Sequence, residues 1–438
     1  MKTVIKPIFN AVLILLFCAK SEARNLIDQQ RDSLISSHIT ININNSNNST
    51  HDSNPDSIKN LISKFYYDQF RHSQNPNVPY VLFLSKDSKL AMGIGGVIRM
   101  RAYYDWDNVI PVPGFAPYLI PMSPTITNSK SVNTTPAGTC FYYRILGQHK
   151  IIGNYQLYIE ANFNGYSARD FHLEKAFATV RDFTIGYANS TFSDPAAIPP
   201  IIDAQGPSNK IVPTNVLIRW MPTIKRNWII AISLETPTTQ ISTDSITANI
   251  SSWLPDIASF IQYQWNQTSH IRLSSIIRTL PYQNLRTKNN HNTLGWGIML
   301  SSVTHPSNRI ATYLTINYGH GYSSLGGDLM IGAYDLVPES ESAGKLYAPA
   351  SFGWCVGLQY NFTRNLFIST SFSQTRFLPT HKTSPNEYRY GLCGNANIFW
   401  NLSPRILFGA EFNYGFRKNF SGESKWAKRV GMIAQFSF

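Results

Sequence analysis

Six arginines are the residues whose type and spacing best support a binding chemistry. They fall on one side of segments in which apolar and polar residues alternate, and they are Arg99, Arg101, Arg144, Arg219, Arg272 and Arg278. A guanidinium carries a rigid fork of N–H donors that matches a carboxylate or a phosphate. A surface built from such groups would attract small anions. The alternative is that carboxylates on the same faces neutralise it, and these are Glu160, Glu174, Glu235 and Glu411.

No residues with the spacing of a catalytic, metal or cofactor site accompany the arginines. The ten histidines are dispersed, no serine stands in a Gly-x-Ser-x-Gly turn, and no phosphate-binding or dinucleotide-binding motif follows a predicted strand. Cys140, Cys355 and Cys393 lack zinc-site spacing, and we expect them to be free thiols. We therefore expect no enzyme activity, no cofactor and no metal. A hydrolase site assembled from residues distant in sequence stays an alternative.

The composition excludes several classes of protein. Charged residues make up 14% of the 438 residues, against roughly 25% in soluble domains. No apolar run of about 20 residues follows the first residues of the chain, as a helical membrane protein would require. The formal net charge is +13, but lysine and arginine are not clustered as in nucleic-acid-binding proteins. We expect no nucleic-acid partner, and we expect the positive charge to attract anions.

The segments that carry the arginines alternate with a period of two. In 89–106, Ile98 and Met100 fall on one face and Arg99 and Arg101 on the other. Stretches of about ten residues with this period, separated by turn residues, are typical of transmembrane β-barrels. The pattern predicts sixteen strands, at 89–106, 138–147, 153–166, 171–181, 183–191, 213–221, 227–235, 255–265, 269–279, 293–303, 309–319, 348–361, 365–376, 386–399, 405–417 and 425–438. The predicted fold is all-β, a transmembrane antiparallel β-barrel.

The connections between these segments support a barrel in an outer membrane. Those after even-numbered strands are short, whereas most of those after odd-numbered strands are long: 107–137, 192–212, 236–254, 280–292 and 320–347. Bacterial barrels have short periplasmic turns and longer external loops. Aromatic residues at strand ends, such as Trp106, Trp220 and Trp400, predict girdles at the lipid headgroups. The alternative is a soluble β protein with ordinary core aromatics.

One predicted strand departs from the pattern. In 171–181, Lys175 and Arg181 share a face with Phe171, Leu173 and Phe177. Basic residues on a lipid-facing surface would cost about 2–4 kcal/mol at mid-depth. We expect either that this strand lies at a subunit interface or that its register differs.

Three regions are predicted along the chain. Residues 1–23 have the basic start, short apolar core and small-residue cleavage site of a signal peptide, with an uncleaved anchor as the alternative. Residues 24–87 form a polar periplasmic leader that we expect to be partly disordered, with an Asn/Ser/Thr tract at 39–57 and an amphipathic helix at 57–71. Residues 88–438 form the barrel.

The loop at 192–212 is rich in proline and unusually apolar for an external connection. It contains Ile198, Ile201 and Ile202, which would avoid water by folding back into the barrel. The loop would then narrow the pore, with Asp194 and Asp203 at the constriction. The alternative is that it packs on a neighbouring subunit.

Three stretches together resemble a known family. They are 89–105 (KLAMGIGGVIRMRAYYD), 171–194 (FHLEKAFATVRDFTIGYANSTFSD) and 203–207 (DAQGP). A glycine-rich first strand, an aromatic-rich strand pair and Asp-x-x-Gly-Pro in the next loop are similar to the DcaP-like outer-membrane porins. The resemblance covers about 89–220, and 24–87 lacks the heptads of that family's coiled-coil extension. It implies a sixteen-stranded, trimeric porin for small anionic solutes, including dicarboxylates.

We therefore expect a porin for passive diffusion in the outer membrane of a Gram-negative bacterium. Its expected partners are outer-membrane lipid, small anionic solutes of the carboxylate type, and two further copies of the chain in a homotrimer. One alternative is a surface adhesin or receptor that binds through loops 107–137 and 320–347. The other is an outer-membrane hydrolase.

Overall fold

The structure is a computed structural model that describes residues 39–42, 81–84, 90–122, 130–164, 170–225, 227–266 and 268–438. The predicted signal peptide, the predicted helix at 57–71 and most of the predicted leader lie outside the described residues. Among the helices of these ranges, none has the length and apolar character to cross a membrane.

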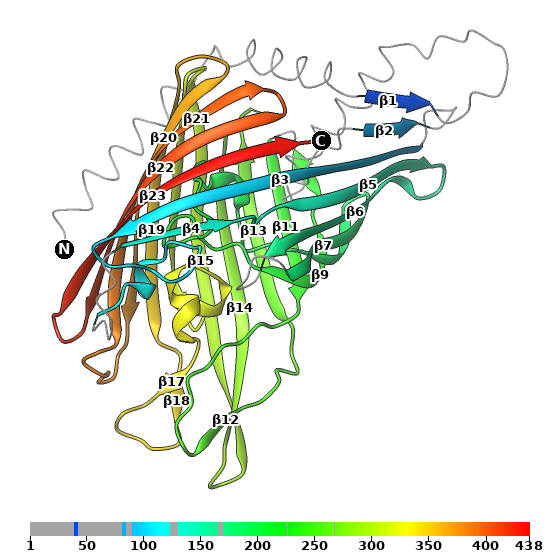
Figure 1. The fold of residues 1–438 in the computed structure, drawn as a ribbon. Coiled ribbons are helices and arrows are strands. Elements are labelled where there is room, and N and C mark those ends of the chain that lie inside the picture. The colour runs from blue at the N-terminus through cyan, green and yellow to red at the C-terminus, as the bar shows by residue number, and fades with distance from the viewer. Residues whose placement is uncertain are drawn as a thin grey trace, which may run out of the picture.

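Sixteen antiparallel strands form a closed barrel, which confirms the predicted fold class (Figure 1). In chain order they are β3 (Leu90–Trp106), β5 (Cys140–His149), β6 (Gly153–Asn164), β7 (Asp170–Val180), β8 (Phe183–Asn189), β9 (Thr214–Trp220), β11 (Trp228–Glu235), β13 (Asp256–Gln264), β14 (His270–Asn284), β15 (Asn289–Ser307), β16 (Ile310–His320), β19 (Ala350–Asn361), β20 (Leu366–Leu378), β21 (Tyr388–Ser403), β22 (Ile406–Asn419) and β23 (Ser424–Ser437). Each pairs with the next, and β23 pairs with β3 to close the ring.

Large apolar side chains cover the outer face of the barrel. On β3, Ile98 is 47% exposed and Met100 is 51% exposed, whereas Arg99 and Arg101 lie on the inward face. Met432 on β23 is 59% exposed. Exposed aromatic rings at strand ends include Tyr104, Trp220, Trp228, Trp400, Tyr414 and Trp426. A continuous apolar surface of this kind is stable against acyl chains and not against water, and amphipathic rings favour the headgroup level.

The first half of β3 extends beyond the end of the chain and is covered by a short strand. Two hydrogen bonds join Gly96 to Phe438, the last residue. On the N-terminal side of Gly96, β2 (Val81–Leu84) replaces β23 as the partner of β3 and pairs with residues 91–94. Strand β1 (Ile39–Asn42) pairs parallel with β2. An edge strand presents unpaired N–H and C=O groups, so β2 completes hydrogen bonding there.

A β-bulge explains the strand that departed from the sequence pattern. The pairing of β6 with β7 shifts by one residue after Glu160, which makes Glu174 the extra residue of β7. The shift turns Lys175 inward, where its ammonium lies 2.9 Å from Glu160, while Leu173 stays 52% exposed on the outer face. Arg181 lies in the turn after β7 with a φ of 51°, and its guanidinium donates to main-chain carbonyls of the neighbouring turn. Neither basic residue faces lipid.

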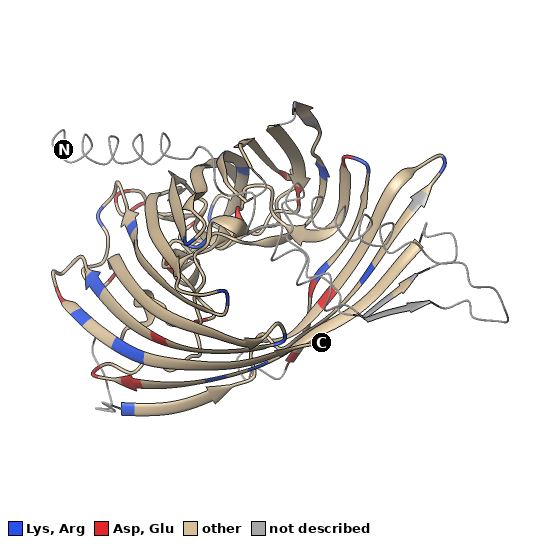
Figure 2. Cartoon of the chain, turned by 90° about the horizontal axis from the view of Figure 1, so that it is seen from above, with Lys and Arg blue, Asp and Glu red and all other residues tan. Residues whose placement is uncertain are grey.

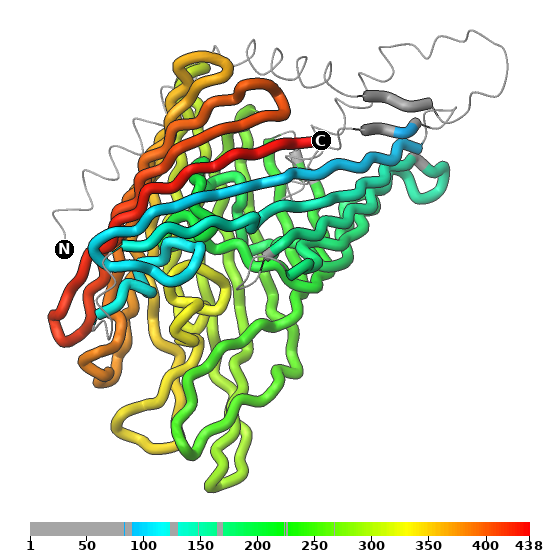
Figure 3. The backbone as a smooth tube through the Cα atoms, in the orientation of Figure 1, coloured from blue at the N-terminus to red at the C-terminus, as the bar shows by residue number. Residues whose placement is uncertain are grey.

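The prediction of a long loop at 280–292 is wrong. Strands β14 and β15 continue through it, so the connection is only the turn at 285–288 (Figure 3). The paired strands form a ribbon that projects from the barrel, and β12 (Thr247–Asn249) pairs with it. Leu280 and Tyr282 on the β14 side of the ribbon are buried against Leu336 and Leu346, whereas residues 289–292 on the β15 side are exposed. The two sides therefore do not share the regular apolar alternation that identifies a lipid-facing strand.

Several connections enter the ring of strands, which Figure 2 shows from above. They include four short 3-10 helices: η1 (Pro117–Leu119), η2 (Pro195–Ala197), η3 (Ser323–Leu325) and η4 (Asp328–Gly332). The shorter strands are β4 (Lys130–Thr135), which pairs with the outer half of β3, β10 (Thr223–Lys225), β17 (Val337–Pro338) and β18 (Leu346–Tyr347).

Candidate functional site

The loop at 190–213 crosses the interior of the barrel. It leaves the short strand β8 and docks on the far wall, where Ile202 is 2% exposed and packs with Phe399 of β21 and Ile433 of β23. The Ile202 N–H donates to Glu411 Oε2 of β22 at 2.9 Å. Phe192 and Ile211 are buried as well, whereas Ile198 and Ile201 are half-buried, so the loop packs within its own barrel. It narrows the space inside the barrel.

Asp194 anchors the first part of this loop. Its Oδ2 lies 2.8 Å from His270 Nε2 and accepts a hydrogen bond of 2.5 Å from Ser301 Oγ, and Arg272 Nη1 lies 3.7 Å from Oδ1. Burial disfavours the charged form, but Arg272 and then His270 outweigh it and hold the pKa of Asp194 well below its usual range. Among the described residues no hydrogen bond joins Ser301 to His270, which is the contact that a catalytic triad requires.

Asp203 joins the same loop to the loop that follows β3. Its Oδ1 accepts hydrogen bonds from the main-chain N–H groups of Phe115, at 2.9 Å, and Gln205, at 2.8 Å. Arg429 of β23 lies 3.5 Å from Asp203 Oδ2 and also pairs with Asp105, at 2.6 Å. The predicted constriction residues therefore hold the loop at two points.

Two further loops fill the external part of the barrel. In the loop after β3, Ile110, Phe115 and Ile120 are buried with Cys393 of β21 and Ala427 of β23. The loop after β16 buries polar side chains, which are Ser323, Ser324, Asp328 and Asp335. These loops therefore reduce the space that the ring of strands encloses.

Inward-facing glycines of the C-terminal strands make room for these loops. A Cβ at Gly357 of β19 would lie 2.7 Å from the Pro199 side chain, and one at Gly415 of β22 would lie 2.8 Å from the Phe115 ring. Such distances are below normal contact, so larger side chains would displace the loops. Glycines on the polar face of these strands are the signal by which the docking wall could have been recognised in the sequence.

Four of the six predicted arginines are buried. Arg144, Arg219, Arg272 and Arg278 are 3% exposed or less. Arg278 pairs with Asp256 at 2.9 Å and with Asp335 at 3.3 Å. Arg272 donates to the Ser193 carbonyl and to Gln262, Arg144 donates to Gln156, and Arg219 lies within electrostatic reach of Glu235. These four groups hold strands and loops together.

Arg99 and Arg101 remain half-buried on the inner face of β3. Arg99 Nε donates to the side-chain oxygen of Gln435 at 2.9 Å, and Arg101 Nη1 donates to the Ala137 carbonyl at 2.8 Å. Within the described part of the chain, neither forms an ion pair with a carboxylate. Their acceptors are neutral oxygens, so the guanidinium groups keep their charge and part of their donor capacity.

Lys210 is a third cation at this level, and the sequence analysis missed it. Its ammonium donates to the Ala204 carbonyl at 3.1 Å, and it lies within electrostatic reach of Arg101, Asp203 and Glu174. No ion pair of Lys210 is present among the described residues. Nothing in the local sequence distinguishes Lys210 from a solvated loop lysine, because only the path of the loop through the barrel brings it opposite β3.

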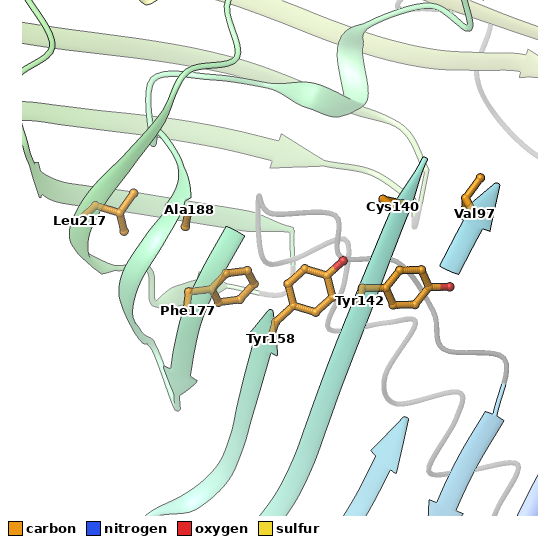
Figure 4. Packing of buried hydrophobic residues seen from close by; sticks show 7 residues of the cluster. All are labelled: Val97, Cys140, Tyr142, Tyr158, Phe177, Ala188 and Leu217. Atoms are coloured by element: carbon orange, nitrogen blue, oxygen red, sulfur yellow. The ribbon is translucent and has the colours of Figure 1, made fainter. Parts of the chain in front are cut away.

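The wall beside these cations is stiffened by a row of buried side chains. Figure 4 shows it across six neighbouring strands, with Val97, Cys140, Tyr142, Tyr158, Phe177, Ala188 and Leu217. The Tyr158 hydroxyl donates to Glu160 at 2.8 Å, and the rings of Tyr158 and Phe177 are 5.4 Å apart. Cys140, Cys355 and Cys393 are free and buried, as predicted.

No family model and no curated protein matches the sequence. The structure matches the outer-membrane channel DcaP of Acinetobacter baumannii with a TM-score of 0.69 over 81% of this chain and 99% of that chain, at 16% sequence identity. The chain has the fold of the DcaP channel. The resemblance found in the sequence is confirmed at the level of the fold.

Other solved outer-membrane barrels are less similar. A loop L8 deletion mutant of OmpT from Vibrio cholerae has a TM-score of 0.49 at 6% identity, over 80% of this chain and 100% of that chain. Salmonella typhi OmpF in complex with daunomycin has a TM-score of 0.47 at 9% identity, over 80% and 98%. The closed barrel with its apolar outer surface is the architecture of a protein of the Gram-negative outer membrane.

Proposed function

We propose that the protein is an outer-membrane porin through which small anionic solutes of the carboxylate type diffuse passively. The observation that supports this most directly is a division among its interior cations. Arg272, Arg278 and Arg429 lie beside carboxylates and are almost fully buried. Arg99 and Arg101 are half-buried and bonded to neutral oxygens. The second kind of cation is available to a passing anion.

The physical basis is an excess of fixed positive charge in a narrow passage. A solute carboxylate that loses part of its hydration is compensated by the N–H donors of Arg99, Arg101 and Lys210. Attraction between unit charges at 4 Å is about 1 kcal/mol in water. A contribution of this size concentrates anions without trapping them, so flux requires neither a cofactor nor an energy source.

The assembly belongs to the same proposal. The sequence resemblance to trimeric porins is the basis for a homotrimer, with part of the apolar outer face covered by neighbouring copies. Size-exclusion chromatography with light scattering on the detergent-purified protein measures the number of chains. A monomer would remove the trimer from the proposal and leave the porin function untouched.

Ion selectivity in a planar lipid bilayer tests the function. In a potassium chloride gradient, we expect stable open channels. Their reversal potential should be shifted from zero toward the equilibrium potential of chloride. The double variant Arg99→Gln/Arg101→Gln should move that potential toward zero. The matched control is Arg286→Gln, because Arg286 is exposed on the turn at the tip of the β14–β15 ribbon. A silent barrel, or a cation-selective wild-type channel, would refute the proposed function.

A further inference from the structure

The β-bulge of β7 directs an acidic side chain into the passage. Two residues of β7, Glu174 and Lys175, oppose the single residue Glu160 of β6, so both face inward. Lys175 forms an ion pair with Glu160. Glu174 is half-buried and accepts a hydrogen bond of 2.8 Å from the amide of Asn162, a neutral donor. In the described ranges Glu174 has no cationic partner at ion-pair distance.

Glu174 is aligned across the sheet with the part of β3 that precedes the available cations. Val97 of β3 is aligned with Cys140 of β5, which is aligned with Asn162 of β6, the residue bonded to Glu174. Arg99 lies two residues beyond Val97. Strands β5 and β6 separate β3 from β7, which places the two backbones about 14 Å apart at the usual strand spacing.

Lys210 of the inserted loop is the third cation near these residues. It is within electrostatic reach of both Arg101 and Glu174, and yet it forms no ion pair with Glu174. One flank of the passage thus presents Arg99, Arg101 and Lys210, and the other presents an acidic acceptor.

We infer that the passage favours solutes that carry an ammonium group as well as carboxylates, and that Glu174 is the residue that recognises the ammonium. This inference rests on the proposed porin function and names the substrate class. The carboxylates of the solute contact the cations of β3 and Lys210, while its ammonium contacts Glu174. A solute with charges of both signs is oriented by the two flanks, whereas a plain dicarboxylate meets repulsion at Glu174.

Succinate and aspartate are the probes, because they share a carbon skeleton and differ by one ammonium group. Their permeabilities are measured from reversal potentials in bilayers with each solute on one side. Glu174→Gln removes the charge at nearly constant volume and keeps an oxygen for Asn162. We expect the aspartate-to-succinate permeability ratio to fall about fivefold in this variant, the size expected for one unit charge about 4 Å from its counter-charge in water. The control is Glu341→Gln, because Glu341 is exposed in an external loop.

The outcomes separate this inference from the porin function. An unchanged permeability ratio in Glu174→Gln, with anion selectivity retained, overturns the role of Glu174 and leaves the porin intact. Loss of anion selectivity in the wild-type protein overturns the proposed function itself. If Glu174→Gln does not fold, which heat-modifiable gel migration shows, Glu174→Ser gives the same test. A ratio that falls in Glu341→Gln as well would assign the effect to overall charge and refute the inference.

Discussion

Removal of the Lys210 charge should weaken the anion selectivity of the channel. Lys210 is held in place by the Ala204 carbonyl, at 3.1 Å, and its methylene chain lies against Gly206. A unit charge about 4 Å from a passing ion contributes about 1 kcal/mol in water and about 4 kcal/mol at an effective dielectric constant of 20. Even the smaller value changes an equilibrium about fivefold. When the Lys210 charge is removed, a passing anion loses this attraction and a passing cation no longer meets the corresponding repulsion.

The assay is the reversal potential of Lys210→Gln in a potassium chloride gradient. We expect the chloride-to-potassium permeability ratio to fall at least about fivefold, and Lys210→Arg should retain the wild-type ratio. Lys288→Gln is the matched control, because Lys288 is exposed on the turn of the β14–β15 ribbon. High salt screens exposed charges, so the measurement is made at low ionic strength. An unchanged ratio in Lys210→Gln would show that the loop lysine does not face the permeating ions.

The pH dependence of selectivity gives an independent check of the same residue. Burial lowers the pKa of Lys210 below its ordinary value, with Asp203 and Glu174 opposing the shift and Arg101 adding to it. The positive charge is complete well below this lowered pKa and is lost as the pH rises through it. The wild-type chloride preference should therefore decline at a lower alkaline pH than an ordinary lysine would predict. Lys210→Arg should not decline, and an equal decline in both proteins would assign the titration to another group.

Three further predictions concern the inserted loops. Burial raises the pKa of Asp328 to about 7 in the folded protein, above the value of about 4 in an unfolded chain. The folded state is therefore most stable below about pH 4, and this contribution to its stability is lost as the pH rises through about 7. Asp328→Asn should remove most of the fall in melting temperature between pH 5 and pH 8, as measured by circular dichroism. Arg278→Met leaves two buried carboxylates without their cation, and a loss of about 3–5 kcal/mol should lower the temperature of heat-modifiable gel migration. Gly357→Leu should push Pro199 away from β19 into the passage, and single-channel conductance should fall; a conductance equal to wild type would place the loop elsewhere.

The strands of the barrel could be predicted because their pattern is local. Ile98 and Met100 face lipid and Arg99 and Arg101 face inward whatever the rest of the chain does, since successive side chains of a strand point to opposite faces. The apolar loop at 190–213 could likewise be predicted to fold inward, because water disfavours its isoleucines. The β14–β15 ribbon could not, because residues 289–292 are polar and exposed, and Leu280 and Tyr282 are buried by a loop that follows later in the chain.

The candidate site was predicted only in part, because its exposure depends on distant contacts. Sequence alone placed six arginines on the inward face, but it could not tell Arg101 from Arg278. Arg278 forms an ion pair with Asp335, 57 residues away, whereas Arg101 donates to a main-chain carbonyl and forms no ion pair among the described residues. Glu174 was grouped with the neutralising carboxylates, and the bulge that separates it from Lys175 appears only in the pairing of two strands.

The amino-acid sequence by itself determined that the chain forms a barrel and which side chains of its regular strands meet lipid. These properties follow from the period of the strand and from the transfer of apolar groups out of water, and both act over a few residues. Only the tertiary structure decided which charges remain available in the passage. Burial and pairing depend on loops that cross the barrel, and long-range contacts of this kind leave no local pattern in the sequence.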